Sequence, residues 1–178
     1  MNRELLEKIY SQYAEELRLY LYSLCRDTAV AEDLMQDVFV KALMSLRDDH
    51  NNFRAWLYRV AHNICINYMK RNGREQLDSS GDHITESIRR NKENDDREYK
   101  DDPLQKLLRR EKQRNLFRAM DRLPGLQREV LVLMYFTGMR TAEVSEVLAI
   151  NPQNVRVAAH RGRKELAKIL EKEGYHEL

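Results

Sequence analysis

The chain has 178 residues, of which 42% are hydrophobic and 34% are charged, and its formal net charge at pH 7 is +2. Its longest apolar run, Val130 to Phe136, is much shorter than the roughly 20 residues that cross a bilayer, which excludes a membrane-spanning protein. Few glycines and prolines and no sustained apolar–polar alternation predict an all-α fold, of one ordinary domain or two small ones.

The N-terminus and the cysteines indicate the cellular compartment. Glu4 and Glu7 follow Arg3 closely, with no apolar signal core, so we expect a cytoplasmic protein. Cys25 and Cys65 have no metal-type spacing and lie in apolar helical stretches, which favours buried, reduced thiols. Whether either cysteine has a redox role stays open.

Residues 1–74 are expected to form a first domain of three helices. The first two have apolar stripes at helical spacing, and Asp27 or Thr28 is expected to cap the second. The third helix begins near Phe53 and ends at Asn72-Gly73, which is a normal helix stop.

Two of these helices also have a polar face. On the second helix, Asp33, Gln36, Asp37 and Lys41 lie away from the apolar stripe. On the third helix, the outward face is expected to show Arg59, His62, Asn63, Asn67 and Lys70. With stacking surfaces from Trp56, Tyr58 or Tyr68, this mixture fits single-stranded nucleic acid. The alternative is that such aromatic residues belong to the core, and we expect this of Trp56.

Residues 75–103 interrupt the helical pattern. Residues 89–102 are nearly all charged or amide side chains. Such a segment cannot bury enough apolar surface to offset the entropy lost on ordering. We interpret it as a flexible charged linker between two small helical domains.

Residues 104–178 are expected to form the second domain. A helix runs from Leu104 to Leu123, and Pro124-Gly125 makes a turn. The strongly apolar helix Val130 to Phe136 is the expected centre of the domain, and Gly138 ends it.

The last two helices form a helix-turn-helix candidate. Thr141 is expected to cap a short helix that reaches Leu148, and Asn151 to cap the final helix, with Pro152 at its first position. If Val155 points inward, the outward face and its flank consist of Gln153, Arg156, Val157, His160, Arg161 and Lys164. Such a basic helix suits the major groove of DNA, whereas the alternative is a merely solvated basic face.

The sequence has no catalytic or cofactor-binding motif. Its five histidines are scattered, no helix holds two of them at ligand spacing around a Glu, and there is no glycine-rich phosphate loop. We therefore expect a protein that is not an enzyme and needs no cofactor or metal.

Three segments match motifs of a known family. Residues 31–39 (AEDLMQDVF) and 53–63 (FRAWLYRVAHN) closely resemble domain two of sigma factors of the extracytoplasmic-function type, in the sigma-seventy family. Residues 123–131, followed by the helix-turn-helix, resemble domain four. The resemblance covers both domains in the right order and omits only the linker. The two N-terminal motifs together are very specific, whereas the helix-turn-helix alone is not.

The resemblance implies a promoter-specificity subunit of bacterial RNA polymerase, with three sets of binding residues. The set that docks on core polymerase, at the clamp helices of its largest subunit, is Asp33, Gln36, Asp37, Phe39 and Lys41. The set for minus-ten DNA is Asn52, Phe53, Arg59, Asn63, Asn67, Lys70, Arg71 and Arg74. Asn63 is implied to line a pocket for a flipped base, whose binding offsets the cost of unstacking. The set for minus-thirty-five DNA is Arg140, Thr141, Gln153, Asn154, Arg156, Val157, His160, Arg161 and Lys164.

The family also implies a regulatory partner. Such factors are often held inactive by an anti-sigma protein that wraps both domains, so the expected partners are core polymerase, promoter DNA and an anti-sigma factor. The sequence favours neither of two roles for His160, which either contacts DNA or is a solvated side chain.

Three residues depart from the family's usual pattern. Ser145 stands where the family often has Ala, Ala149 where it often has Gly, and Ala158 at a frequently basic position. An alanine at a turn that needs a positive φ costs on the order of 1 kcal/mol.

Two other functions fit parts of the sequence. An autonomous regulator would use the same helix-turn-helix, usually as a dimer on half-sites about one helical turn apart. The modest net charge argues mildly against it, because a subunit that works inside a larger complex can use the basic surface of its partner. A helical adaptor without a nucleic-acid role leaves the basic last helix unexplained.

Overall fold

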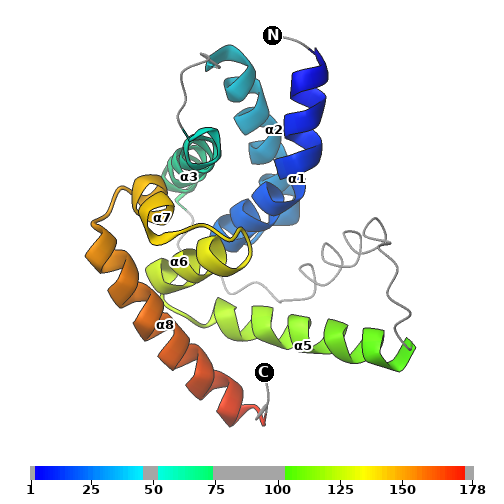
Figure 1. The fold of residues 1–178 in the computed structure, drawn as a ribbon, viewed down its shortest axis with the longest axis vertical. Helices are drawn as coiled ribbons and strands as arrows, with labels where there is room; N and C mark the ends of the chain where they lie inside the picture. Colours follow the sequence, from blue (N-terminus) through cyan, green and yellow to red (C-terminus); the bar gives the residue numbers. More distant parts are fainter. Residues whose placement is uncertain (1–2, 46–51, 74–102, 175–178) are drawn as a thin grey trace.

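The computed structural model describes residues 3–45, 52–73 and 103–174, without the side chains of 3, 103–110 and 113. Every regular element in those ranges is an α-helix, which confirms the predicted all-α fold. The helices are α1 (Arg3–Cys25), α2 (Thr28–Ser45), α3 (Phe53–Arg71), α5 (Pro103–Asp121), α6 (Gly125–Tyr135), α7 (Thr141–Leu148) and α8 (Pro152–Lys172) (Figure 1). The predicted linker falls almost entirely outside the described residues, and so does Arg74.

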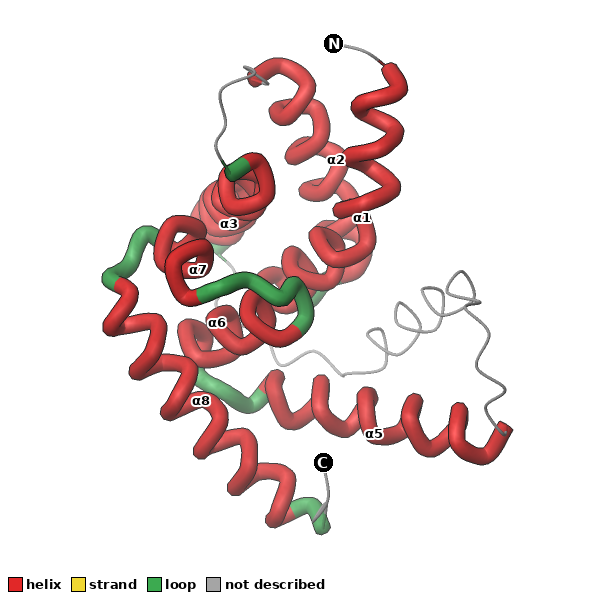
Figure 2. The backbone as a smooth tube through the Cα atoms, in the orientation of Figure 1, coloured by secondary structure: helices red, strands yellow, loops and turns green. Residues whose placement is uncertain are grey.

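Helices α1, α2 and α3 lie side by side and contact one another (Figure 2). Their buried apolar side chains form a shared core. Leu17 and Leu21 of α1, Val38 of α2 and Leu57 of α3 are fully buried there. Each such side chain stabilises the fold by roughly 1.5–3 kcal/mol relative to an exposed one. The apolar stripes of the sequence therefore become the interior of this half.

Side chains fix the ends of these helices. Of the two predicted caps of α2, the structure selects Asp27, whose carboxylate accepts a hydrogen bond from the backbone N–H of Val30 at 3.0 Å. Asn52 caps α3, since its side-chain oxygen accepts the backbone N–H of Ala55 at 3.1 Å. The predicted stop of α3 is confirmed, because the helix ends at Arg71 and Gly73 has a φ of +58°.

Helix α6 is the centre of the C-terminal half, as predicted. Its residues Val130, Leu131 and Leu133 are buried, and the helix begins at Gly125, earlier than its apolar run. Helix α8 crosses it closely at Gly162, where an added Cβ would lie 3.1 Å from the side chain of Leu131. Glycine at this position therefore lets α8, the long basic helix, pack closely against α6.

Helices α7 and α8 contact each other and form the predicted helix-turn-helix. The prediction that Thr141 caps α7 is wrong, because Arg140 is the capping residue and Thr141 is the first residue of the helix. The carboxylate of Glu143 accepts the Arg140 backbone N–H at 2.9 Å, so a side chain from inside the helix closes its end. Asn151 caps α8, with Pro152 at its first position, as predicted.

The turn between α7 and α8 has the strained geometry that the sequence indicates. Ala149 is exposed and has φ 52° and ψ 43°, in the left-handed region that favours glycine. The Ser145 hydroxyl donates a 2.6 Å hydrogen bond to the backbone oxygen of Ile150. The serine that departs from the family's pattern therefore helps to close a turn in which alanine is strained.

Replacing Ala149 with glycine is expected to raise the free energy of unfolding by about 0.5–1 kcal/mol, because glycine adopts this backbone conformation without strain. The matched control is Ala167→Gly, at an exposed position inside α8, which is expected to lower stability by about 1 kcal/mol. Urea unfolding followed by circular dichroism measures both variants. A lower free energy of unfolding for Ala149→Gly than for wild type would contradict the inference that the backbone at Ala149 is strained.

The N-terminal and C-terminal halves contact each other. Helix α3 packs against α7, and α1 packs against α6, while α5 projects away from the body (Figure 1). Buried apolar residues of both halves belong to one continuous cluster. The sequence predicts two domains but does not predict this contact.

Candidate nucleic-acid and protein interfaces

Helix α2 presents an exposed acidic face. Asp33, Gln36 and Asp37 are exposed on it, and Lys41 is exposed at its edge. Phe39, which the sequence assigns to the same face, is only 5% exposed and packs its ring 4.9 Å from that of Tyr10. The exposed surface therefore excludes Phe39.

The same face contains apolar side chains that sequence reasoning missed. Val40 is 51% exposed and Met44 is 83% exposed. At 100° per residue, both lie on the side of α2 that carries Asp33 and Asp37. We call Asp33, Gln36, Asp37, Val40 and Met44 the α2 face. Exposed apolar side chains beside acids are typical of a protein-binding surface.

Helix α3 presents an exposed stripe of amide and basic side chains. Arg59, Asn63, Asn67 and Lys70 are all exposed, at spacings of three or four residues that place them on one side of the helix. Arg71 is exposed in the last turn, where its Nε donates to the backbone oxygen of Asn67 at 3.4 Å. We call these five residues the α3 stripe.

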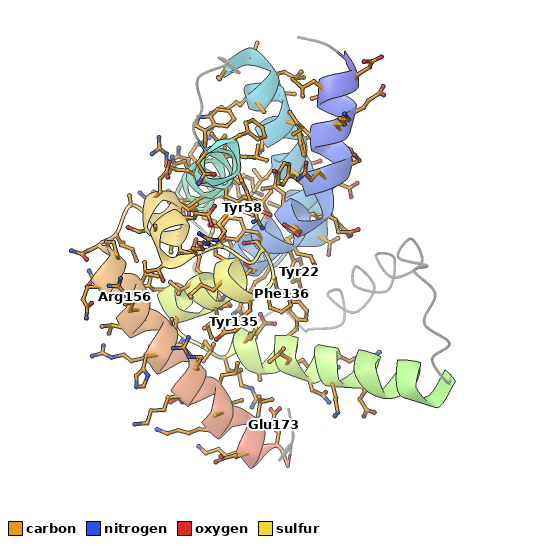
Figure 3. The ribbon with its side chains drawn as sticks, viewed as in Figure 1. Tyr22, Tyr58, Tyr135, Phe136, Arg156 and Glu173 are labelled. Atoms are coloured by element: carbon orange, nitrogen blue, oxygen red, sulfur yellow. The ribbon has the colours of Figure 1, made fainter. Side chains whose placement is uncertain are left out.

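The aromatic residues of α3 are less accessible than a stacking role needs. Tyr58 is fully buried, and its ring lies 5.4 Å from that of Tyr20, so the prediction that Tyr58 offers a stacking surface is wrong (Figure 3). Phe53 and Trp56 are half-buried, with ring centroids 5.7 Å apart, and both pack on the core. The core assignment of Trp56 agrees with this packing.

His62 and Asn52 contact the C-terminal half instead of solvent. His62, predicted on the outward face of α3, has its Nδ1 atom 2.6 Å from the Glu129 carboxylate. Asn52 donates its side-chain N–H to the Glu143 carboxylate at 3.2 Å. Hydrogen bonds from the Arg140 backbone and from Asn52 lower the pKa of Glu143 below its ordinary value. Both α3 contacts join residues that are far apart in the sequence.

Helix α8 presents the predicted basic face. Its exposed residues are Gln153, Asn154, Arg156, Val157, His160, Arg161 and Lys164. Figure 3 shows Arg156 projecting away from the body of the protein. Val155, Ala159 and Gly162 are buried on the opposite side, as predicted. Arg140 is exposed and Thr141 half-exposed at the start of α7.

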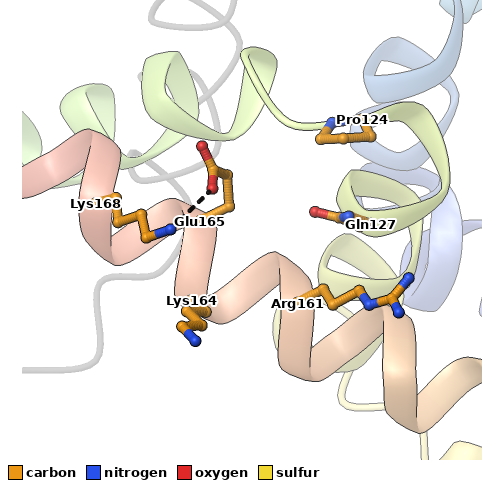
Figure 4. A pocket seen from close by; sticks show the side chains of 6 residues that line it. All are labelled: Pro124, Gln127, Arg161, Lys164, Glu165 and Lys168. Carbon is orange, nitrogen blue, oxygen red and sulfur yellow. Dashed lines mark ion pairs between the residues drawn. The ribbon is translucent and has the colours of Figure 1, made fainter.

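Next to this face is an open hollow between α8 and the start of α6. Its lining residues are Pro124, Gln127, Arg161, Lys164, Glu165 and Lys168 (Figure 4). Lys168 lies 3.9 Å from Glu165, an exposed pair that contributes little to stability. With three cations and one acid, the hollow has the charge that suits a phosphate of a DNA backbone.

The cysteines lie in the N-terminal half. Cys65 is buried and Cys25 is half-buried, and both are free thiols. A hydrogen bond from Cys65 lowers the pKa of the Cys25 thiol.

In the part of the chain that the structure describes, no cluster of three metal-ligating side chains occurs. None of the described helices is long and apolar enough to cross a membrane.

Both halves match models of one protein family. Residues 9–75 match sigma-70 region 2, and residues 113–166 match sigma-70, region 4. The chain is 33% identical over 175 residues to the RNA polymerase sigma factor YlaC of Bacillus subtilis, across 96% of this chain and 95% of the relative. It is 28% identical over 165 residues to the ECF RNA polymerase sigma factor SigM of the same species, across 92% and 94% of the two chains.

Solved structures share the fold. CnrH, in complex with the cytosolic domain of CnrY, has a TM-score of 0.66 and 21% identity, over 96% of this chain and 90% of that one. The sigma factor RpoE of Bartonella quintana, in complex with the anti-sigma factor NepR, has a TM-score of 0.64 and 20% identity, over 93% and 96%.

Proposed function

The chain belongs to the sigma-70 family, as an RNA polymerase sigma factor of the extracytoplasmic-function type, and on this premise we propose which of its surfaces bind polymerase and promoter DNA. The α2 face docks on core polymerase, the α3 stripe reads and melts the minus-ten element, and the basic face of α8 reads the minus-thirty-five element. The observation that carries this proposal is that one chain presents all three exposed faces, each with chemistry suited to its partner.

The chemistry of each face supports its role. Acids and exposed apolar side chains on the α2 face suit a protein surface that offers cations and apolar contacts. Amides and cations on the α3 stripe suit bases and phosphates of a separated strand. The N-terminal half of α8 carries the amide and guanidinium groups that read base edges in a major groove.

The autonomous regulator, the alternative that the sequence leaves open, is wrong. The family match includes the N-terminal half as well as the helix-turn-helix, and the relatives are sigma factors along nearly their whole length. The adaptor without a nucleic-acid role fails for the same reason.

The proposed mechanism uses no catalytic group of this chain. It acts in the bacterial cytoplasm as a specificity subunit, and polymerase supplies the chemistry of transcription. Because CnrH was solved in complex with the cytosolic domain of CnrY, and RpoE in complex with the anti-sigma factor NepR, we include an anti-sigma factor among the partners of this chain.

Run-off transcription tests the function directly. Sigma-free core polymerase is incubated with a bacterial genomic fragment pool, with and without this protein. Discrete start sites that appear only with the protein establish the function and identify the promoter sequence. Absence of new starts, together with failure to bind core polymerase on a sizing column, contradicts it.

Arg161→Ala is expected to weaken binding of the polymerase complex to promoter duplex, because it removes a cation from the hollow beside α8. If Arg161 meets a phosphate, the slope of log affinity against log salt falls in magnitude by about 1, with little change in sequence preference. The matched control is Lys172→Ala, in the last turn of α8, roughly 16 Å along the helix at 1.5 Å per residue. An unchanged slope in Arg161→Ala, measured by fluorescence anisotropy, excludes the phosphate contact.

A further inference from the structure

Cys65 lies close to two other sulfur-containing side chains, where α3 packs against α1. Cys25 is the last residue of α1, and Cys65 and Met69 lie one turn apart on α3. The side chains of Cys25 and Cys65 form a hydrogen bond with each other, and Cys65 Sγ lies 4.0 Å from Met69 Sδ. The chain has two cysteines, so both of its thiols meet at this one place.

The two thiols differ in access to solvent and in acidity. Cys65 is fully buried inside α3, whereas Cys25 is half-buried at a helix end. The hydrogen bond from Cys65 lowers the pKa of the Cys25 thiol, while the same hydrogen bond, together with burial, raises the pKa of Cys65. Because the thiolate is the nucleophilic form of cysteine, Cys25 is the thiol that reacts first with an oxidant arriving from solvent.

The backbone at Cys25 allows the two sulfur atoms to come together. A disulfide bond is about 2.0 Å long, which is shorter than a hydrogen bond between thiols, so one side chain has to move. Cys65 is held inside a helix, whereas Cys25 ends one, and helix ends fray. Arg26 follows with a φ of 55°, so the chain leaves the helix at this point. The movement of Cys25 breaks its 3.4 Å hydrogen bond to the backbone oxygen of Asp27.

We propose that Cys25 and Cys65 are a peroxide-reactive thiol pair, whose oxidation product is a disulfide that ties the end of α1 to α3. In the first step, the Cys25 thiolate attacks one oxygen of hydrogen peroxide. An S–O bond forms, the O–O bond breaks, and the leaving hydroxide takes up the proton that the Cys25 thiol released. In the second step, the Cys65 sulfur attacks Cys25 Sγ, an S–S bond forms, the S–O bond breaks, and hydroxide leaves with the Cys65 proton as water. Two thiols and one peroxide thus give one disulfide and two waters.

The disulfide protects the N-terminal half without covering its exposed surface. A sulfenic acid beside a thiol condenses to a disulfide, which thiol reductants reverse, whereas further oxidation to the sulfinic acid is irreversible in most proteins. The bond closes a loop of about 40 residues and stabilises the fold by restricting the unfolded chain. Asn63 and Asn67 each lie about 200° around α3 from Cys65 at 100° per residue, so the α3 stripe stays exposed in the oxidised chain.

Oxidation of the reduced full chain tests the pair directly. The chain is treated with a small excess of hydrogen peroxide, free thiols are alkylated with N-ethylmaleimide, and mass spectrometry and peptide mapping locate the products. We expect a chain that has lost two hydrogen atoms, has no free thiol and yields a peptide cross-linked through Cys25 and Cys65. Dithiothreitol is expected to restore both thiols. Circular dichroism is expected to give a Tm roughly 5–15 °C higher for the oxidised chain than for the reduced one.

Two variants assign the order of the two steps. In Cys65→Ala, peroxide is expected to leave a sulfenic acid at Cys25 that dimedone captures. In Cys25→Ala, the remaining thiol is buried and has a raised pKa, so its oxidation is expected to be at least roughly tenfold slower. The matched control is Met69→Leu, which removes the neighbouring sulfur but neither thiol and is expected to form the disulfide at the wild-type rate. Circular dichroism verifies folding, and the wild-type result decides the disulfide even if a variant does not fold.

Four results would each overturn a part of this inference. Two free thiols after peroxide treatment, or disulfides only between chains, overturn the pair itself. A wild-type product that carries oxygen atoms on Cys25 and that dithiothreitol does not reverse overturns the role of Cys65. Oxidation of Cys25→Ala as fast as that of Cys65→Ala overturns the order of attack, and a disulfide that leaves Tm unchanged or lower overturns its stabilising effect. None of these measurements involves polymerase or DNA, so the proposed function stands or fails separately.

Discussion

Asp37→Arg is expected to weaken binding to sigma-free core polymerase at least a hundredfold while leaving the fold intact. Asp37 is exposed on the α2 face, so its replacement leaves no hole in the core. Reversing the charge places a cation where the proposed partner surface offers cations, and like charges across an interface cost several kcal/mol. A loss of about 3 kcal/mol corresponds to a hundredfold change in affinity.

The matched control for this prediction is Glu32→Arg. Glu32 is also exposed on α2, but it lies about 140° around the helix from Asp37 at 100° per residue. Both variants change the net charge equally, so a general electrostatic effect weakens both. Affinity is measured by co-purification and by anisotropy titration with labelled protein. Equal affinities for the two folded variants would place the docking surface elsewhere.

Val40 and Met44 show why the sequence did not define the α2 face completely. At 100° per residue both lie off the apolar stripe and are exposed beside Asp33 and Asp37, but the polar face predicted from the sequence includes only charged and amide side chains. The opposite error concerns Phe39, which the motif assigns to docking but which packs on Tyr10 of another helix. A local pattern gives the helix and its faces, whereas tertiary packing decides which apolar residues remain on the surface.

Helix ends were largely predictable because their chemistry is local. Asp27, Asn151 with Pro152, and Gly73 lie beside the backbone groups that they satisfy or the turns that they allow. The sequence pattern predicts the cap of α7 one residue late, because threonine is a common cap and the carboxylate of Glu143 acts from inside the helix.

The contacts between the halves were not predictable by the same reasoning. Glu129 is 67 residues from His62 and 109 from Tyr20 in sequence. No local periodicity links such positions, and an acid at the start of an apolar helix normally indicates a solvated turn. Helical spacing therefore predicts His62 among the exposed residues of α3, although its ring contacts Glu129 of the other half.

Asn63→Ala is expected to slow promoter opening ten- to a hundredfold while changing the affinity for core polymerase less than about twofold. The Asn63 side chain is exposed in the middle of the α3 stripe, so its loss removes no core packing. Extruding a base costs a few kcal/mol, and hydrogen bonds to the flipped base offset that cost. An amide that makes such bonds only after the base leaves the stack acts on melting and not on the earlier docking step.

The measurement compares two steps on the promoter that run-off transcription identifies. Permanganate reactivity of unpaired thymines gives the rate of opening, and titration gives the polymerase affinity. The control substrate is the same promoter with its minus-ten segment mismatched, on which Asn63→Ala is expected to recover most of its activity because separation of the strands is no longer required. Equal loss of opening and of polymerase binding, with no recovery on the mismatched template, would indicate that Asn63 supports the fold and not the separated strand.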